Sequence, residues 1–198
     1  MFMDLPFSQA CENNKAVILE VLQRYFADVD YVLEVGSGTG QHAVFFAEHL
    51  PHLYWQAADQ QDYLEGINRW LDWAERDNLL PPLPLDVNQE WPVSTAPAIF
   101  SANTVHIMSW QEVERFFSGI NKVLEVGGIF CLYGPFNYDG KFTSESNANF
   151  EQLLKNRNPL SGIRDFEAVQ GLAEQAGLVL LDDLAMPANN RCLVWKKQ

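Results

Sequence analysis

Short runs of apolar residues alternate with amphipathic stretches along most of the chain. The apolar runs predict strands, and they cover residues 31–35, 53–58, 83–87, 98–103 and 129–134. The amphipathic stretches repeat their apolar positions every three or four residues and predict helices, at residues 16–26, 42–50, 62–77, 111–126, 149–156 and 166–176. Strands that alternate with helices indicate a parallel sheet that is covered on both faces.

Two further apolar runs, residues 178–186 and 192–197, break this rhythm. The segment MPANNR between them is too short for a parallel crossover, so the two strands must pair antiparallel if they pair. The whole pattern resembles the sheet of class I methyltransferases. That resemblance implies an α/β fold, a Rossmann-like three-layer sandwich whose seven-stranded, mostly parallel sheet has its last strand antiparallel. No linker or repeat divides the sequence, and we expect residues 1–198 to form a single domain.

The composition is typical of a globular protein, with 47% apolar residues and a formal net charge of −13. An acidic surface repels phosphate backbones, so nucleic acid is not an expected partner. The sequence contains no signal-peptide pattern and no stretch that approaches the roughly 18 apolar residues of a membrane span. We therefore expect a cytoplasmic protein without a membrane partner. Cys11, Cys131 and Cys192 form no C-x-x-C motif and predict neither a metal site nor a disulfide.

The stretch VLEVGSGTGQHA follows the first predicted strand and leads into a helix. A glycine-rich turn at this place lets the backbone approach a ligand, and the helix start offers free N–H groups. The dinucleotide fingerprint would need a third glycine at position 41, where the chain has Gln41. The G-x-G-x-G spacing, with Glu34 two residues earlier, instead resembles motif I of S-adenosylmethionine-dependent methyltransferases. We expect cofactor contacts from Gly36, Ser37, Gly38 and Gly40, with an indirect contribution from Glu34. The alternative is a tight turn that binds no ligand.

Polar residues also follow the later strands, and ligands of open α/β sheets lie at the carboxyl ends of the strands. The Asp59 carboxylate can accept hydrogen bonds from both ribose hydroxyls, although nicotinamide enzymes use the same contact. Asp86 can accept from an adenine amino group, or it can act as a local cap. The expected contacts after the second, third and fourth strands are Asp59 and Gln60, Asp86 and Val87, and Ala102 and Asn103.

His106 lies in NTVHIMSW, after the fourth predicted strand. An unperturbed imidazole, with a pKa near 6.5, can take a proton from a nucleophile at neutral pH. His106 is therefore the candidate catalytic residue, and the alternative is that it bonds the backbone and shapes the pocket. We expect His42, His49 and His52 to lie on the surface, with His42 near the cofactor.

Several longer motifs resemble one branch of the class I methyltransferases: EVGSGTGQHA, NTVHIMSW, YGPF, SGIRD and MPANN. The branch is catalogued mainly as a domain of unknown function, and its animal members are named methyltransferase-like proteins. The resemblance covers residues 5–195 and implies an S-adenosylmethionine pocket. Asn14 and Lys15 match an N-terminal asparagine–basic pair that is expected to close over the cofactor. The family often has Ala-Ser where this chain has Val35-Gly36, and it brings no settled substrate or catalytic residue.

The same motifs supply a set of aromatic, amide and basic side chains that we expect to face the methyl acceptor. These are Tyr133, Phe136, Asn137, Asn147, Arg164, Asn189 and Asn190. Uncharged amides beside aromatic rings favour a small polar acceptor. The alternatives are that MPANN is a turn with local side-chain bonds and that Arg164 and Asp165 form an ion pair at a helix start.

The sequence thus favours an S-adenosylmethionine-dependent methyltransferase that acts on a small molecule and releases S-adenosylhomocysteine. Two other hypotheses remain open. One is a protein that binds the cofactor or its product without turnover. The other is a nicotinamide-dependent oxidoreductase, against which Gln41 and the closing hairpin argue.

Overall fold

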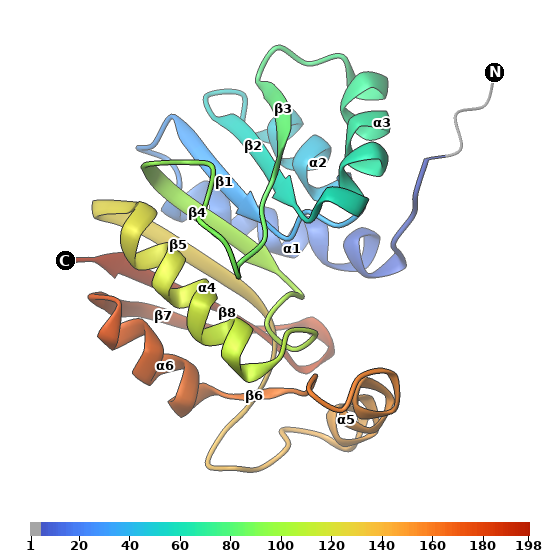
Figure 1. Cartoon of the computed structure of the whole chain (residues 1–198), viewed down its shortest axis with the longest axis vertical. Helices are drawn as coiled ribbons and strands as arrows, with labels where there is room; N and C mark the ends of the chain where they lie inside the picture. The colour runs from blue at the N-terminus through green and yellow to red at the C-terminus, as the bar shows by residue number, and fades with distance from the viewer. Residues whose placement is uncertain (1–4) are drawn as a thin grey trace.

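One sheet runs through the centre of the molecule in the computed structural model, which describes residues 5–198 (Figure 1). The strands are β1 (Tyr31–Val35), β2 (Tyr54–Asp59), β3 (Leu79–Pro84), β4 (Ala96–Ala102), β5 (Leu124–Asn137), β6 (Arg164–Asp165), β7 (Leu178–Met186) and β8 (Asn190–Lys197). The helices are α1 (Gln9–Tyr25), α2 (Gln41–His49), α3 (Leu64–Ala74), α4 (Trp110–Val123), α5 (Glu145–Arg157) and α6 (Phe166–Gln175). Short 3-10 turns, η1 (Gln61–Tyr63) and η2 (Pro187–Asn189), complete the chain.

The strand order is β3-β2-β1-β4-β5-β8-β7, with the two-residue strand β6 paired to the end of β5. Strands β1 to β5 are mutually parallel, whereas β8 is antiparallel to both β5 and β7. The predicted closing hairpin and the antiparallel last strand are therefore confirmed. The sheet brings the carboxyl ends of β1, β2 and β4 together at one edge, where the glycine loop begins.

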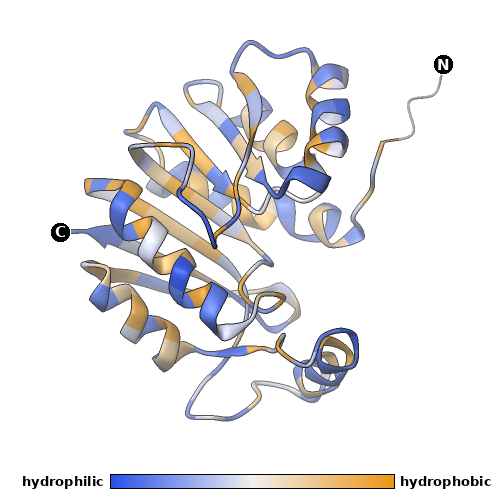
Figure 2. Cartoon of the chain, viewed as in Figure 1, coloured by the Kyte–Doolittle hydropathy of each residue, from blue (hydrophilic) through white to orange (hydrophobic). Residues whose placement is uncertain are grey.

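Two apolar clusters hold the three layers together. Alternate residues of each strand point to opposite faces, so Leu33 and Val35 belong to one cluster while Val32 belongs to the other. The first cluster contains the buried faces of α4 and α6, and the second contains those of α1, α2 and α3. Figure 2 shows the resulting contrast between apolar strands and polar outer helix faces. Helix α5 stands apart from both layers in Figure 1.

Several predicted boundaries were wrong, and three of them have a clear physical reason. Strand β3 begins at Leu79 rather than at residue 83, because Pro81, Pro82 and Pro84 are tolerated in a strand at the edge of the sheet. Helix α4 ends at Val123, since residues 124–126 already belong to β5. Helix α1 starts seven residues before the predicted position 16, at Gln9, because the Ser8 side chain accepts a bond from the Cys11 N–H and caps it. No helix within residues 5–198 is long and apolar enough to cross a membrane.

Candidate functional site

A cavity of about 510 Å³ opens at the carboxyl edge of the sheet. Its walls come from the glycine loop after β1, the end of β2, the turn after β3, the segment after β4 and the first turn of α1. Phe150 of helix α5 closes one side. A cavity of this size and position, at the ends of parallel strands, is typical of a cofactor or small-molecule site.

The cavity brings together nine of the residues that the sequence singled out: Gly36, Ser37, Gly38, Asp59, Gln60, Val87, Ala102, Asn103 and His106. Four other predicted cofactor residues lie outside its lining, namely Asn14, Glu34, Gly40 and Asp86. The seven predicted acceptor residues, Tyr133, Phe136, Asn137, Asn147, Arg164, Asn189 and Asn190, also lie outside it. The Asp86 carboxylate accepts bonds from the Asn88 backbone N–H and side-chain amide, at 2.9 Å each, so it shapes its own turn.

The glycine loop has no room for side chains where it meets the segment after β4. Gly36 has φ +80°, and a Cβ built on it would stand 2.3 Å from Thr104 Cγ2. Gly38 has φ +57° but an open surrounding, so its constraint is conformational alone. No side chain of Gly36 or Gly38 therefore covers the loop backbone where it lines the cavity, so a ligand can approach this backbone closely.

Glu34 is hydrogen-bonded to this loop. Its buried carboxylate accepts bonds from Ser37 Oγ and from Trp55 Nε1, both at 2.9 Å. Ser37 Oγ in turn accepts the Ala58 N–H at 3.1 Å. Burial raises the pKa of Glu34 to about 7, partly offset by these two hydrogen bonds. Glu34 thus acts on the loop through the Ser37 side chain, while its contribution to cofactor binding stays a prediction.

The pKa of Glu34 predicts a loss of stability at alkaline pH. The native pKa of about 7 exceeds the ordinary value of 4.5. The protonated carboxyl therefore contributes stability that is fully present below pH 4.5 and is lost as the pH rises through 7. The Glu34→Gln variant keeps a neutral acceptor at the same place. The variant should therefore gain stability relative to the native chain as the pH rises. The difference between its free energy of unfolding and that of the native chain should be about 2–3 kcal/mol larger at pH 8 than at pH 5. Urea unfolding at both pH values measures this difference, and equal differences would contradict it.

Asp59 stands at the end of β2 with its carboxylate fixed from two sides. The Gly38 N–H donates to one oxygen and the Gln60 N–H donates to the other, both at 2.7 Å. Burial raises the pKa of the carboxyl, while the two N–H groups oppose that rise. The carboxylate is therefore anchored to the glycine loop and still lines the cavity.

His106 lies across the cavity in the segment after β4 and is 5% exposed. Its Nδ1 is buried and has no hydrogen-bond partner within residues 5–198. Burial lowers the pKa of His106 to about 4, and the positive charge of Arg164 adds to the effect. The ring contacts Phe150 edge to face, with the centroids 5.4 Å apart. The imidazole is therefore neutral at physiological pH and has an unused nitrogen.

The SGIRD motif holds the segment that carries His106. The Gly162 N–H donates to His106 O at 2.9 Å, and Ser161 Oγ donates to Ile107 O at 2.8 Å. Arg164 donates from Nε to Val105 O at 2.9 Å and from Nη2 to Met108 O and Leu160 O. The Arg164 side chain is buried under this segment and shows no ion pair with Asp165.

Side-chain amides of the MPANN motif and of α5 donate hydrogen bonds that join these two segments. Asn147 donates to Asn189 O at 3.3 Å, and the Asn189 amide donates to Ser146 Oγ at 3.3 Å. These bonds join the start of α5 to the turn between β7 and β8. They agree with the turn alternative and explain how α5 is held where Phe150 reaches the cavity.

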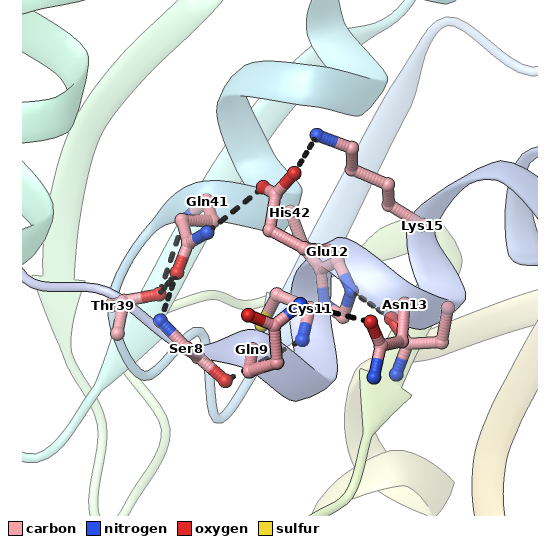
Figure 3. Close-up of polar contacts among 10 residues, drawn as sticks. Ser8, Gln9, Cys11, Glu12, Asn13, Lys15, Thr39, Gln41 and His42 are labelled. Atoms are coloured by element: carbon pink, nitrogen blue, oxygen red, sulfur yellow. Dashed lines mark hydrogen bonds and ion pairs between the residues drawn. The ribbon is translucent and has the colours of Figure 1, made fainter.

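The first turn of α1 is tied to the start of α2, a feature that the sequence did not predict (Figure 3). The Ser8 N–H donates to Gln41 Oε1 at 2.5 Å, and Gln41 Nε2 donates to Glu12 Oε1 at 3.0 Å. Glu12 also pairs with Lys15 at 2.6 Å. Through these contacts Ser8 and Cys11 become part of the cavity wall. The cap signal at Ser8, ahead of an apolar helix, could have revealed this start.

His42 is 5% exposed, so its predicted surface position was wrong, although it does line the cavity. Its Nε2–H donates to Asn14 Oδ1 at 2.7 Å, and its Nδ1 faces Cys11 Sγ at 4.0 Å. Asn14 lies outside the cavity lining and contacts His42, which is part of it. His49 and His52 are exposed, as expected. The described residues contain no cluster of His, Cys, Asp and Glu that could hold a metal ion.

A sequence profile of the family described as Protein of unknown function (DUF938) matches residues 5–197. The chain belongs to this family. The match covers nearly the whole sequence, and the motifs of the cavity wall and of its support fall within it. The family description leaves the reaction open, so the chemistry must be argued from the site.

Several solved methyltransferase structures share the fold at low sequence identity. An O-methyltransferase family protein from Burkholderia thailandensis has a TM-score of 0.84 at 13% identity, covering 96% of this chain and 57% of that one. The S-adenosylmethionine-dependent methyltransferase SibL, solved without ligand, has a TM-score of 0.79 at 20% identity, covering 95% and 55%. Human N-acetylserotonin methyltransferase, solved with S-adenosylmethionine, has a TM-score of 0.79 at 13% identity, covering 96% and 53%. The chain thus has the Rossmann-like methyltransferase fold and spans little more than half the length of these proteins.

Proposed function

We propose that the chain is an S-adenosylmethionine-dependent methyltransferase that acts on a small-molecule acceptor. The observation that carries this proposal is the anchored Asp59 carboxylate beside the bare glycine loop, in one cavity at the carboxyl edge of the sheet. A carboxylate at this place suits the ribose hydroxyls, and the loop suits the amino-acid end of the cofactor. The fold shared with S-adenosylmethionine-dependent methyltransferases supports the same assignment.

The contacts around Gln41 disfavour a dinucleotide. In dinucleotide-binding folds the pyrophosphate meets the N-terminus of the helix after the glycine loop. Here that helix start carries Gln41, whose side chain bonds to Ser8 and to the acidic Glu12. A negative carboxylate and the first turn of α1 thus lie where a diphosphate would need open N–H groups. S-adenosylmethionine has no phosphate and avoids this conflict.

The residues of the cavity fit the parts of this cofactor. Leu85, Val87 and Asp59 line the cavity; the two apolar side chains would form a wall for adenine, and the carboxylate would accept from the ribose hydroxyls. Gly36 leaves the loop backbone free, since any Cβ there would meet Thr104. When bound, S-adenosylmethionine supplies an electrophilic methyl group on its sulfonium. The His106 imidazole lines the same cavity, but its lowered pKa of about 4 does not favour the proton uptake expected from the sequence. The surrounding walls orient the acceptor and exclude water.

Isothermal titration with S-adenosylmethionine and S-adenosylhomocysteine tests the proposal directly. The native chain should bind both, and absence of binding up to millimolar concentrations would reject it. The Asp59→Asn variant should bind about 10- to 100-fold more weakly, because one oxygen of the side chain no longer accepts hydrogen bonds. Asp62→Asn, at an exposed position outside the cavity lining, is the matched control and should bind as the native chain does. Native affinity in the Asp59→Asn variant would show that the Asp59 carboxylate does not bind the cofactor.

A further inference from the structure

The two oxygens of the Glu112 carboxylate have different surroundings. Glu112 occupies the N3 position of α4, lines the cavity and is partly exposed. Its Oε2 accepts the Ser109 N–H at 2.7 Å, which completes the capping box at the start of the helix. Within residues 5–198, its Oε1 accepts one long hydrogen bond, from the exposed Asn88 amide at 3.4 Å. One oxygen of the carboxylate can therefore accept a stronger bond from a ligand in the cavity.

The contacts of Asn88 place this carboxylate beside the turn after β3. Asn88 follows Val87 directly in the chain. Its amide donates to Glu112, and its Oδ1 accepts from Arg115, which lies one turn later on α4. The start of α4 is thereby joined to the turn that carries Val87. Val87 and Leu85 are the lining residues that the proposed function assigns to the adenine ring.

The backbone contacts of β2 give the order of the groups along this wall. The Asp59 carboxylate accepts the Gly38 N–H of the glycine loop, and Asp59 O accepts the Leu85 N–H at 2.8 Å. The wall thus leads from the glycine loop through Asp59 and Leu85 to Glu112. In S-adenosylmethionine the ribose lies between the methionine part and the adenine. With the ribose at Asp59 and the methionine part at the glycine loop, the adenine reaches the part of the wall beside Glu112.

Asp86, which the sequence singled out for the adenine amino group, has a different place. It lies outside the cavity lining, and its Oδ1 already accepts two bonds from Asn88. Glu112 carries the same functional group inside the lining, from a helix that the sequence did not connect with the cofactor. The structure therefore offers Glu112 in place of Asp86 as the acceptor for this amino group.

The charge state of Glu112 decides which base it can accept. The hydrogen bond from the Ser109 backbone lowers the pKa of Glu112, so the side chain is a carboxylate at neutral pH. A carboxylate only accepts hydrogen bonds. Adenine has an amino group at its sixth ring position, which donates, whereas hypoxanthine has a carbonyl oxygen there, which only accepts. The carboxylate therefore favours adenine and leaves hypoxanthine with two acceptors facing each other.

We propose that the Glu112 carboxylate accepts a hydrogen bond from the exocyclic amino group of adenine and thereby selects the cofactor against its deaminated, hypoxanthine form. This rests on the proposed function. The contact is to the base, so Glu112 determines affinity for the cofactor and its product and leaves the chemical step to other groups.

The experiment compares S-adenosylhomocysteine with S-inosylhomocysteine, which carries a carbonyl oxygen in place of the amino group. Isothermal titration gives both affinities for the native chain. We expect S-adenosylhomocysteine to bind about 10- to 100-fold more tightly, the value of one hydrogen bond to a charged group. The Glu112→Gln side chain can donate as well as accept, so in this variant the ratio should fall below about threefold. Both affinities are measured on the same protein, so a smaller folded fraction leaves their ratio unchanged.

Two controls accompany this variant. Asp86→Asn tests the residue that the sequence favoured and should keep the native ratio, since Asp86 lies outside the lining. Glu114→Gln, at an exposed position of α4 outside the lining, removes a neighbouring charge and should also keep it. If Glu112→Gln does not fold, Glu112→Asp keeps an acid in the first turn of α4 but withdraws it by one methylene, and it should lower the ratio as well.

The outcomes separate this inference from the proposed function. Equal affinities of the native chain for the two compounds would overturn the role of Glu112, as would a native ratio in folded Glu112→Gln or, where that variant does not fold, in Glu112→Asp. A ratio that collapses in Asp86→Asn would return the contact to Asp86 and overturn it too. Failure of S-adenosylmethionine and S-adenosylhomocysteine to bind would instead reject the proposed function.

Discussion

Gly36→Ala is expected to weaken S-adenosylmethionine binding by about a hundredfold or more, equivalent to about 3 kcal/mol. The added methyl would stand 2.3 Å from Thr104 Cγ2, a distance that forces the loop or the segment after β4 to move. The left-handed backbone at φ +80° adds about 1–2 kcal/mol for a residue with a Cβ. Titration calorimetry gives the affinity, and thermal unfolding shows whether the fold is kept.

A double variant separates the clash from the backbone strain. Thr104→Ser removes the clashing Cγ2 but keeps the hydroxyl that pairs with Ser101 Oγ at 2.7 Å. Gly36→Ala combined with Thr104→Ser should therefore regain part of the lost affinity. Gly38→Ala, with a similar φ of +57° and no neighbour within 4 Å, should lose less than Gly36→Ala. Native affinity in the single Gly36→Ala variant would show that the loop does not approach the cofactor.

Arg164→Met is expected to lower the free energy of unfolding by about 3–4 kcal/mol. The substitution removes the donors to three carbonyls, Val105 O, Met108 O and Leu160 O, and leaves these acceptors in a buried region. Unpaired buried acceptors cost about 1–3 kcal/mol each before relaxation. Because two of these carbonyls flank His106, the variant should also weaken any activity that depends on the imidazole. Chemical denaturation measures the stability.

Arg157→Met is the matched control for this substitution, since Arg157 is exposed at the end of α5 and should change stability by less than about 0.5 kcal/mol. The same pair also decides between two interpretations of Arg164. A direct substrate contact, as the sequence suggested, predicts native stability with impaired acceptor binding. Support of the His106 segment predicts a clear loss of stability.

The sequence predicted well those features that depend on short-range pattern. Periodicity predicts the alternating strands and helices and the closing hairpin. The rule that ligands lie at the carboxyl ends of parallel strands predicts the place of Asp59 at the end of β2. The start of β3 was predicted too late, because three prolines disfavour a strand anywhere except at the edge of a sheet. Its edge position depends on the strand order, which local propensity does not reveal.

The prediction of acceptor residues depended on contacts that a sequence does not display. Arg164 looks like a binding group, but its partners are backbone carbonyls, two of them more than fifty positions away. A bond to a backbone carbonyl cannot be recognised from the type of residue that supplies it. Gln41 was recognised only as a missing glycine, whereas the structure gives it a positive role in joining α1 to α2. Phe150 was missed because α5 carries few apolar residues and shows no buried face in its pattern.

The position of β8 also constrains the order in which the chain can fold. Strand β8 follows β7 in sequence but lies between β5 and β7. Neither β5 nor β7 can complete its pairing until residues 190–197 have been added. Strands β1 to β4, on the other side of β5, can pair earlier, whereas the second edge of β5 stays unpaired until β8 is added. Such late, non-local pairing slows folding and leaves a strand edge open to pairing with other chains until β8 is in place.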